Sequence, residues 1–303
     1  MNHRSLYRRT RTPFTLLATV SVGVALLFTS IGPASASGSP SPAASADRSG
    51  TASKPTVVLV HGAWADGSSW NGVITRLRSE GYRVVAPPNP LRGVRSDAAY
   101  LADYLKTLKG PIVLVGHSYG GMVITNAALG STDVKALVYI DAFIPAKGQS
   151  AGEIAASEPG SGVIVQDPTT VFNLVPFPGA PDGDADLYLK PQVVRSSFAQ
   201  DLSAVQQNRI VATQRPLAAS AVTEPSGEPA WKTIPSWALI GRQDRIIPAA
   251  AQEAAAKAAH TKVQEIDSSH LSLVSHPDAV VRLITTAART SWLYCLAAST
   301  RCE

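Results

Sequence analysis

The sequence predicts an α/β fold: a six-stranded, mostly parallel sheet with helices on both faces and a lid insertion, 143–233, after the fourth strand. The first reason is that short apolar runs, often β-branched, alternate with amphipathic stretches of helical length. The second is that these runs are continuously apolar, as expected of parallel strands covered on both faces. The third is that the alternation breaks for about 90 residues, far more than an ordinary connection needs.

Each expected strand is followed by a turn or by a helix that opens with a capping residue. The first helix, 70–81, is expected to be capped by Ser68 or Ser69, and a closing helix is expected to begin at Pro277. The remaining expected helices are 96–110, 119–129 and 248–260. The expected strands are 56–60, 82–87, 111–116, 135–141, 236–241 and 262–267.

The charge balance argues against a nucleic-acid-binding surface. Of the 27 Lys and Arg residues, four lie in the first 36 positions, where no acidic residue occurs. The rest of the chain therefore has 23 basic against 22 acidic residues, a net charge of +1. We expect no basic patch for nucleic acid on such a chain.

The first 36 residues are expected to be a secretory signal peptide. Basic and polar residues 1–13 precede an uncharged stretch, 14–31, and a small-residue cleavage pattern that ends at Ala36. Cleavage there would release a secreted, extracellular protein with no stable membrane anchor. The alternative is an uncleaved anchor, because the uncharged stretch just reaches the length that spans a bilayer. Residues 37–54, rich in Ser, Ala, Pro and Gly, are expected to be a flexible linker.

The globular domain is expected to span 55–294, followed by a C-terminal tail, 295–303. The two cysteines, Cys295 and Cys302, both belong to this tail. In an exported protein such a pair is expected to form a disulfide, the alternative being two free thiols. Neither cysteine is near the motifs described next, which disfavours a thiol nucleophile.

The stretch Gly116-His117-Ser118-Tyr119-Gly120 fits the pattern Gly-x-Ser-x-Gly between a strand and a helix. A serine on so tight a turn projects above the sheet, and glycine leaves the necessary room two residues away on either side. The N–H group of Tyr119, at the start of the helix, would face a developing oxyanion. We therefore expect Ser118 to be a catalytic nucleophile. The alternative is a glycine-rich turn with an incidental serine.

A serine hydroxyl needs a general base to become a good nucleophile. In enzymes with this serine motif the acid and then the histidine follow the serine along the chain, which removes His61 and His117. His260 is expected to be solvated at a helix end, and His276 to mark the entry of the closing helix. His270, in the loop after the sixth strand, is therefore the expected base.

The acid that orients the histidine is expected to be Asp244, which follows the fifth strand. Asp141, at the end of the fourth strand, is the competitor, and would otherwise be a structural carboxylate bonded to loop amides. The second oxyanion donor is expected to be the N–H group of Ala63, after the first strand, where Gly62 allows close approach. His61 in that turn is expected to be a structural hydrogen-bonding residue.

These motifs resemble those of the α/β-hydrolase superfamily, in particular the branch that holds plant methyl-ester esterases, hydroxynitrile lyases and bacterial esterases. The resemblance implies the same roles for the residues already named: Ser118 as nucleophile, Asp244 as acid, His270 as base, and the amides of Ala63 and Tyr119 as the oxyanion hole. The stretches that carry it are 58–70, 113–123, 241–248 and 268–277.

Departures from the family bear on the reaction. Relatives with an aspartate nucleophile, the dehalogenases and epoxide hydrolases, are disfavoured by Ser118. Hydroxynitrile lyases of this branch carry threonine and lysine where this chain has Gly62 and Leu271, so the cation that stabilises cyanide is missing. Cofactor-free haloperoxidases share the same catalytic set and remain an alternative.

The sequence thus predicts a carboxylic ester hydrolase that acts through a Ser-His-Asp triad and an acyl-enzyme. The alternatives are a perhydrolase or a hydroxynitrile-lyase-like enzyme of the same fold, and a non-catalytic binder, which would have no use for an intact triad. Apolar residues of the insertion, among them Phe172, Leu174 and Phe198, favour a roof over an acyl pocket and a small apolar ester as substrate. No metal or cofactor motif occurs, so neither is expected.

Overall fold

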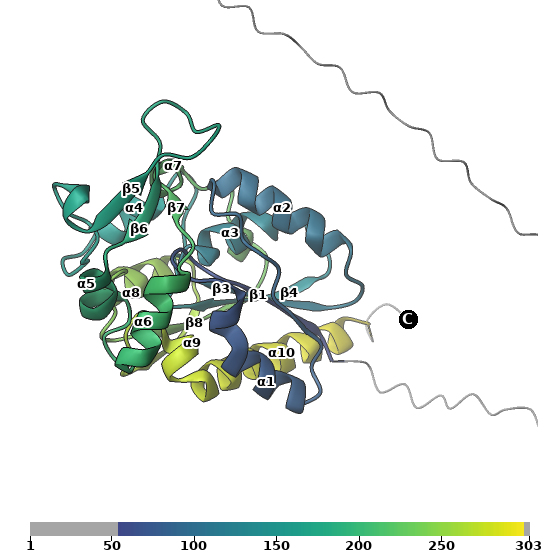
Figure 1. The fold of residues 1–303 in the computed structure, drawn as a ribbon. Helices are drawn as coiled ribbons and strands as arrows, with labels where there is room; N and C mark the ends of the chain where they lie inside the picture. The colour runs from purple at the N-terminus through teal and green to yellow at the C-terminus, as the bar shows by residue number, and fades with distance from the viewer. Residues whose placement is uncertain (1–53, 300–303) are drawn as a thin grey trace, which may run out of the picture. The chain divides into compact units, whose positions relative to one another are not determined.

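A computed structural model describes residues 54–299. Its central sheet has six strands, all parallel, in the order β2-β1-β3-β4-β8-β9 (Figure 1). The predicted fold class is confirmed, and every expected strand is present, although β2 is shorter than expected. The strands are β1 (Thr56–Val60), β2 (Val84–Val85), β3 (Ile112–His117), β4 (Val134–Ile140), β8 (Ser236–Gly241) and β9 (Lys262–Ile266).

The strand order determines where a site can form. The chain places β2 on one side of β1 and β3 on the other, so the strand order reverses at β1. In parallel sheets a crevice opens at the carboxyl ends of the strands at such a reversal. Val60 of β1 pairs with Gly116 of β3, so the turns that carry His61 and Ser118 begin side by side at this crevice.

Helices cover both faces of the sheet (Figure 1). On one face α1 (Asn71–Ser79) packs against α10 (Pro277–Ser299), and on the other α2 (Val94–Lys106) packs against α3 (Gly120–Ala127). A fifth helix, α8 (Ala249–Ala258), packs on β8 and β9. Every residue of β1, β3 and β8 is buried, which explains why these strands are continuously apolar in the sequence.

The start of the first helix differs from the prediction. Asp66 is the capping residue, in place of Ser68 or Ser69, and its carboxylate accepts a hydrogen bond from the N–H group of Ser68 at 2.8 Å. A 3-10 turn, Gly67–Trp70, follows, and α1 begins only at Asn71. The serines were reasonable candidates because Asp, Ser and Thr cap helices by the same hydrogen bond.

The insertion after β4 has a structure of its own. It contains a three-stranded antiparallel sheet in the order β5-β6-β7, which the sequence pattern did not indicate, and a π-helical turn, Val194–Phe198. Its strands and helices are α4 (Ala151–Ala156), β5 (Phe172–Val175), β6 (Asp186–Leu189), α5 (Pro191–Val193), α6 (Ala204–Thr213), β7 (Leu217–Ala218) and α7 (Ala219–Thr223). A short helix after β9, α9 (Ser272–Ser275), completes the fold.

Several predictions concern segments beyond the described part of the chain. The expected signal peptide and nearly all of the expected linker precede residue 54. Helix α10 continues to Ser299, so the first residues of the expected tail are helical. The side chain of Cys295 and the whole of Cys302 lie outside what the structure describes, so their pairing stays a prediction. Within residues 54–299, none of the helices has the length and apolar character needed to cross a membrane.

Candidate active site

Ser118 lies on the tight turn between β3 and α3. Its φ angle is 53°, in the left-handed region that residues other than glycine rarely adopt, so the turn stores backbone strain. The surrounding chain holds it in place: the N–H group of Ser118 donates to the carbonyl of Ile140 at 3.3 Å, and its carbonyl accepts from Gly121 at 2.8 Å. The serine therefore has a fixed position at the crevice end of the sheet.

Three glycines make room for this turn. A Cβ atom at Gly116 would lie 2.6 Å from the carbonyl oxygen of Gly120, and one at Gly120 would lie 2.6 Å from that of Val60. A Cβ atom at Gly62 would lie 2.5 Å from the Cβ atom of Ser118. Because all three distances are far below van der Waals contact, the close approach of β1, β3 and α3 requires glycine at each position.

Two backbone N–H groups beside Ser118 are available to a ligand. Ala63 and Tyr119 line the same cavity as Ser118. Within the described part of the chain, neither N–H group donates a hydrogen bond. The side chain of Tyr119 is held by its hydroxyl, which donates to the buried carboxylate of Asp97 at 3.0 Å. N–H groups left free beside a serine can stabilise an oxyanion that forms there.

His270 and Asp244 meet although they belong to different loops. Asp244 follows β8 and His270 follows β9, and the loops lie together because these strands are adjacent and parallel. Nδ1 of His270 lies 2.7 Å from Oδ2 of Asp244, and both side chains are fully buried. An ionised carboxylate can only accept, so this contact assigns the proton to Nδ1. Nε2, the other ring nitrogen, has no hydrogen-bond partner among residues 54–299.

Burial and hydrogen bonding act in opposite directions on this pair. Loss of hydration lowers the pKa of His270 to about 3, and burial is also the largest influence on Asp244, where it raises the pKa of the carboxyl. Hydrogen bonds to the Asp244 carboxylate from the N–H groups of Ile246 (2.8 Å) and Ile247 (3.0 Å) and from Gln252 (2.8 Å) offset part of this rise, because they favour the ionised form. The buried imidazole is thus neutral near pH 7 and has a free electron pair on Nε2.

Asp141, the competing acid, binds loop amides. Its Oδ1 atom accepts from the N–H group of Gly241 at 2.8 Å, and its Oδ2 atom accepts from the N–H group of Ser272 at 3.1 Å and from the Ser272 hydroxyl. These contacts tie the end of β4 to β8 and α9. No hydrogen bond joins Asp141 to His270 in the described chain, so of the two carboxylates Asp244 alone has that contact.

Two further histidines support the site from within the core. Nε2 of His117 donates to the carbonyl of His270 at 2.9 Å, and the two rings lie 4.9 Å apart. Nε2 of His61 accepts from the N–H group of Asn89 at 3.1 Å, and Nδ1 of His61 donates to the carbonyl of Gly62 at 2.9 Å. Sequence reasoning set His117 aside on chain order and missed its contact with His270.

An apolar cavity of about 360 Å³ opens beside Ser118. No charged side chain lines it, and the indole nitrogen of Trp64 is already bonded to the carbonyl of Leu187 at 2.8 Å. Much of its wall comes from the insertion, where Ile164 and Leu174 are 41 % and 45 % exposed and so mark its mouth. The other insertion residues that line it include Val163, Val165, Pro168, Phe172, Leu217 and Val222.

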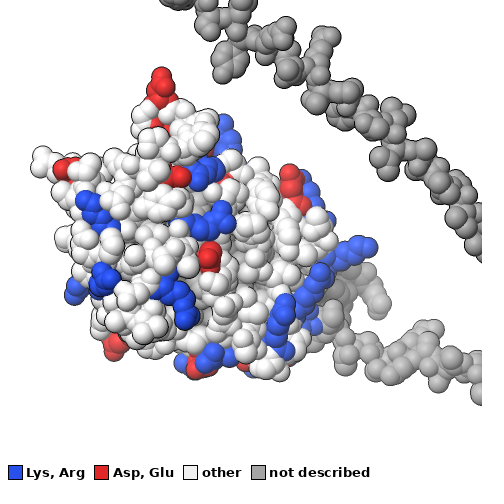
Figure 2. All heavy atoms as spheres, viewed as in Figure 1, with Lys and Arg blue, Asp and Glu red and all other residues white. Residues whose placement is uncertain are grey.

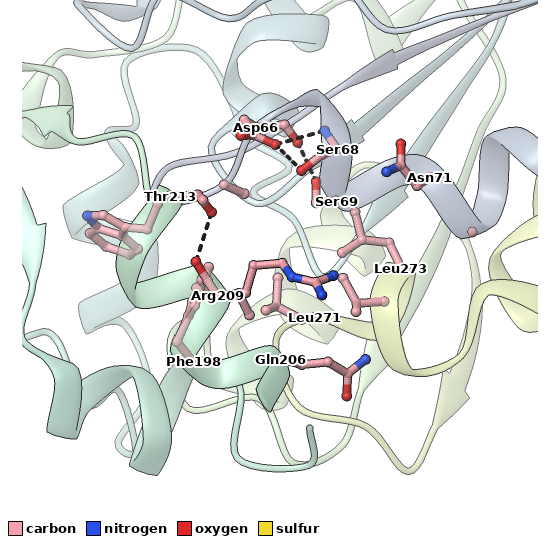
Figure 3. Close-up of a pocket in the computed structure, with 15 residues that line it drawn as sticks. Asp66, Ser68, Ser69, Asn71, Phe198, Gln206, Arg209, Thr213, Leu271 and Leu273 are labelled. Carbon is pink, nitrogen blue, oxygen red and sulfur yellow. Dashed lines mark hydrogen bonds between the residues drawn. The ribbon is translucent and has the colours of Figure 1, made fainter. Parts of the chain in front are cut away.

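A second cavity, of about 230 Å³, shares Trp64 with the first but has a more polar lining (Figure 3). Arg209 of α6 reaches along Leu271 and Leu273 on one side, and Asp66 lies on the other. None of the expected catalytic residues lines this cavity. Ser118 and the two residues with free N–H groups, Ala63 and Tyr119, line the apolar cavity, which is therefore the candidate site.

The remaining sequence candidates lie apart from this site or form no centre. His276 contacts the hydroxyl of Ser275 at 2.8 Å, and His260 follows the end of α8. In the described part of the chain, no three His, Cys, Asp or Glu side chains gather as metal ligands would. Figure 2 shows Lys, Arg, Asp and Glu in scattered groups on the visible face.

The family model described as "Alpha/beta hydrolase family" matches residues 57–283. The chain therefore belongs to the alpha/beta hydrolase family, as its motifs predicted. The matched range includes Ser118, Asp244 and His270 as well as the whole insertion.

Individual relatives add detail. The chain is 38 % identical over 106 residues to a carbendazim hydrolyzing esterase of Nocardioides sp. (strain SG-4G), which covers 31 % of this chain and less than half (44 %) of that protein. It is 27 % identical over 262 residues to the alpha/beta hydrolase nvfD of Aspergillus novofumigatus (strain IBT 16806), which covers 78 % of this chain and 97 % of that one. The structure of polyneuridine aldehyde esterase matches the fold with a TM-score of 0.64 at 18 % identity, over 77 % of this chain and 98 % of that chain. Two of these three proteins are named esterases, in agreement with the expected enzyme class.

Proposed function

We propose that this chain is a secreted serine hydrolase of carboxylic esters, with Ser118 as nucleophile, His270 as base and Asp244 as the acid that orients it. The observation that carries the proposal is the buried contact between His270 and Asp244, which leaves a neutral imidazole with one free nitrogen at the same sheet edge as the strained serine. Two relatives named esterases support the same reaction class. Secretion rests on the N-terminal sequence alone.

In the first half of the reaction, Nε2 of His270 takes the proton from the hydroxyl of Ser118 while its oxygen attacks the ester carbonyl. The negative charge that forms on the carbonyl oxygen is stabilised by the N–H groups of Ala63 and Tyr119. The carbon–oxygen bond to the alcohol then breaks, and the histidinium donates its proton to the leaving alkoxide. Asp244 stabilises the imidazolium and keeps its ring in one orientation.

In the second half, water replaces the alcohol. His270 takes a proton from the water, the hydroxide attacks the acyl carbonyl, and the same two N–H groups stabilise the second tetrahedral intermediate. Collapse of this intermediate returns the proton to Ser118 and releases the acid. The cycle consumes one ester and one water and leaves the chain unchanged, so it needs no metal and no cofactor.

The apolar cavity supports a substrate with an uncharged, apolar acyl or alcohol group. Burying a charged group against these walls would cost far more than burying a methylene chain. The insertion forms much of the wall, and this supports its role as a roof that excludes water from the site. The same lining disfavours the lyase alternative, because the cavity offers no cation to bind cyanide.

Hydrolysis of p-nitrophenyl acetate, butyrate and octanoate by the wild type and by Ser118→Ala tests the proposal. We expect the wild type to hydrolyse the butyrate or octanoate with higher kcat/KM than the acetate, and Ser118→Ala to lose the activity. Three results would contradict it: cyanohydrin cleavage without ester turnover, peroxide-dependent halogenation alone, or tight binding of the esters without reaction.

Secretion is tested separately by expressing the full chain in an exporting bacterial host. We expect the protein in the culture medium to begin at Ser37, after removal of the signal peptide. A full-length chain retained in the membrane fraction would contradict cleavage and favour the uncleaved anchor.

A further inference from the structure

Asp201 of the insertion binds the loop that carries His270. Its Oδ2 atom accepts from the N–H group of Ser269 at 3.0 Å and from the hydroxyl of Ser268 at 3.3 Å. The hydroxyl of Ser269 donates to the other carboxylate oxygen, Oδ1. Ser268 and Ser269 are fully buried and directly precede His270, so one carboxylate fixes the backbone and side chains on the entry side of the imidazole.

The residues just before Asp201 bind the loop that carries Asp244. The side-chain amide of Gln200 donates to the carbonyl of Gln243 at 2.6 Å. The guanidinium of Arg245 donates to the carbonyl of Ser196 at 3.0 Å. Segment 196–201, which we call the clamp segment, therefore contacts the residues on both sides of Asp244 as well as those before His270.

The clamp segment also packs on the imidazole itself. The ring of Phe198 lies 5.4 Å from the ring of His270, centre to centre, and is fully buried. Phe198 ends the π-helical turn, in which the N–H group of Ala199 donates to the carbonyl of Val194 at 2.8 Å. Such turns are rare and are frequently found at functional sites.

Asp201 is suited to this contact because it stays ionised. Burial opposes its charge, but the hydrogen bonds around the carboxylate, led by those from Ser269, together outweigh burial and hold the pKa of Asp201 below its usual value. Hydrogen bonds to an ionised acceptor are roughly twice as strong as those between neutral groups. Asp201 is thus charged at any pH at which the enzyme is expected to work.

We propose that Asp201 is a positioning residue for His270, and that the clamp segment makes the insertion part of the catalytic support as well as a cavity wall. The inference rests on the proposed function of His270 as general base. The physical reason is that catalysis depends on holding Nε2 to within a fraction of an ångström, and a displacement of about 1 Å can cost about 100-fold in rate.

Several groups lie against His270 and influence the pKa of its imidazole. Asp244 contacts Nδ1, the ring of His117 lies against the imidazole, and Phe198 covers it from the insertion. Asp141 reaches the same loop through Ser272. Loss of the Asp201 contacts leaves all of these groups in place but allows water to enter, so the pKa of His270 should rise toward its ordinary value of 6.5.

Asp201→Ala tests the proposal, with Asp184→Ala as a matched control. Asp184 lies in the same insertion and binds a serine in the same way, accepting from the N–H group of Ser220 at 3.0 Å and from its hydroxyl at 2.6 Å. Its carboxylate has no hydrogen bond to the loops of Asp244 or His270 in the described structure. The two variants therefore lose similar contacts at different places.

The test needs two measurements: the kinetics of ester hydrolysis, and the pKa of His270, which can be measured without catalysis. For Asp201→Ala we expect kcat on p-nitrophenyl butyrate to fall by about 10- to 100-fold with KM changed by no more than about two-fold. We also expect the pKa of His270, followed by NMR of the labelled imidazole, to rise relative to the wild type. Asp184→Ala should keep both values. If Asp201→Ala does not fold, Ser269→Ala should show the same changes in smaller size, because it removes the hydroxyl contact with Asp201 and a long hydrogen bond from the N–H group of Leu271 but keeps the backbone contact with Asp201.

The two proposals fail in different ways. If esters are hydrolysed but Asp201→Ala matches Asp184→Ala in both kcat and the pKa of His270, the positioning role of Asp201 is wrong and the proposed ester hydrolysis stands. If the wild type hydrolyses no ester but the pKa of His270 still rises in Asp201→Ala alone, the proposed ester hydrolysis is wrong and the positioning role of Asp201 stands. If the pKa of His270 is unchanged in both variants, the positioning role of Asp201 is overturned whatever the activity.

Discussion

Nδ1 of His270 lies 2.7 Å from Oδ2 of Asp244, although 26 residues separate them in the chain. The contact follows from topology, because parallel neighbours β8 and β9 bring the loops at their carboxyl ends together. Gln252 of α8 donates to the same Oδ2 atom at 2.8 Å, so the carboxylate is held by a helix as well as by its own loop. The pair is therefore built before any substrate arrives.

Asp244→Asn should remove most of the activity. The amide N–H group of asparagine would favour the tautomer of His270 with its proton on Nε2, which cannot accept the proton of Ser118. We expect a loss on the order of 10⁴-fold in kcat. The matched change, Asp141→Asn, alters a carboxylate that binds amides and the Ser272 hydroxyl, so it should lower Tm with less than about a ten-fold loss in kcat. Kinetics and thermal melts of both variants show which carboxylate orients His270. A larger loss of kcat in Asp141→Asn would assign the acid to Asp141.

The pH dependence of kcat/KM should show a base that stays neutral in mild acid. Burial lowers the pKa of His270 below its ordinary value of 6.5, and a lowered pKa means that the neutral, active form persists to lower pH. Activity is lost only as pH falls through the lowered pKa, so the midpoint of the acid limb should lie below 6.5. Rates measured from about pH 4 to about pH 9 test this. A midpoint at or above 6.5 contradicts the account of the buried pair.

Gly62→Ala should damage the site without an added charge or a lost hydrogen bond. The new Cβ atom would lie 2.5 Å from the Cβ atom of Ser118 and 2.8 Å from the carbonyl oxygen of His117, so the end of β1 or the serine turn must move. We expect kcat to fall by about 100-fold or more. Gly67→Ala is the control, because its Cβ atom would meet nothing closer than 3.7 Å, and kcat should be unchanged. Equal activity in the two variants would mean that the serine turn tolerates this displacement.

Leu174→Ser should separate apolar substrates from small ones. Leu174 lines the apolar cavity, and its replacement removes apolar contact from the wall near the mouth. We expect KM for p-nitrophenyl octanoate to rise about five-fold and KM for the acetate to change little. Val205→Ser is the control, since Val205 is also in the insertion and is 70 % exposed but does not line the cavity. Equal effects on the two esters would contradict a role of the insertion in substrate recognition.

The central sheet could be predicted because its strands and turns are marked by residues that lie close together in the sequence. Continuous apolar runs mark β1, β3 and β8, and the glycines around Ser118 mark a turn that only a strand followed by a helix provides. The contact of His270 with Asp244 was predicted from chain order, which this topology constrains strongly. The first helix cap was wrong because Asp66 offers the same hydrogen bond as the nearby serines.

The interior of the insertion could not be predicted, because its contacts are distant in the sequence. β7 has two residues and pairs with a strand about 30 positions earlier, which leaves no periodic pattern to read. Asp201 contacts Ser269 across 68 positions, and nothing in the residues around it distinguishes it from Asp184, which binds a different serine. His117 was visible in the motif, but its hydrogen bond to His270 depends on the fold of both loops.

The most direct test of the account is covalent labelling of the purified protein with a fluorophosphonate, followed by intact mass measurement and peptide mapping. The reagent reacts only with a serine activated by a neighbouring base, so it reports the assembled site and does not depend on the choice of ester. We predict one adduct per chain, on the peptide that contains Ser118, and no adduct in Ser118→Ala or in denatured protein. An unlabelled wild type, or a Ser118→Ala variant that labels as fast as the wild type, would contradict the assignment of Ser118 as the nucleophile.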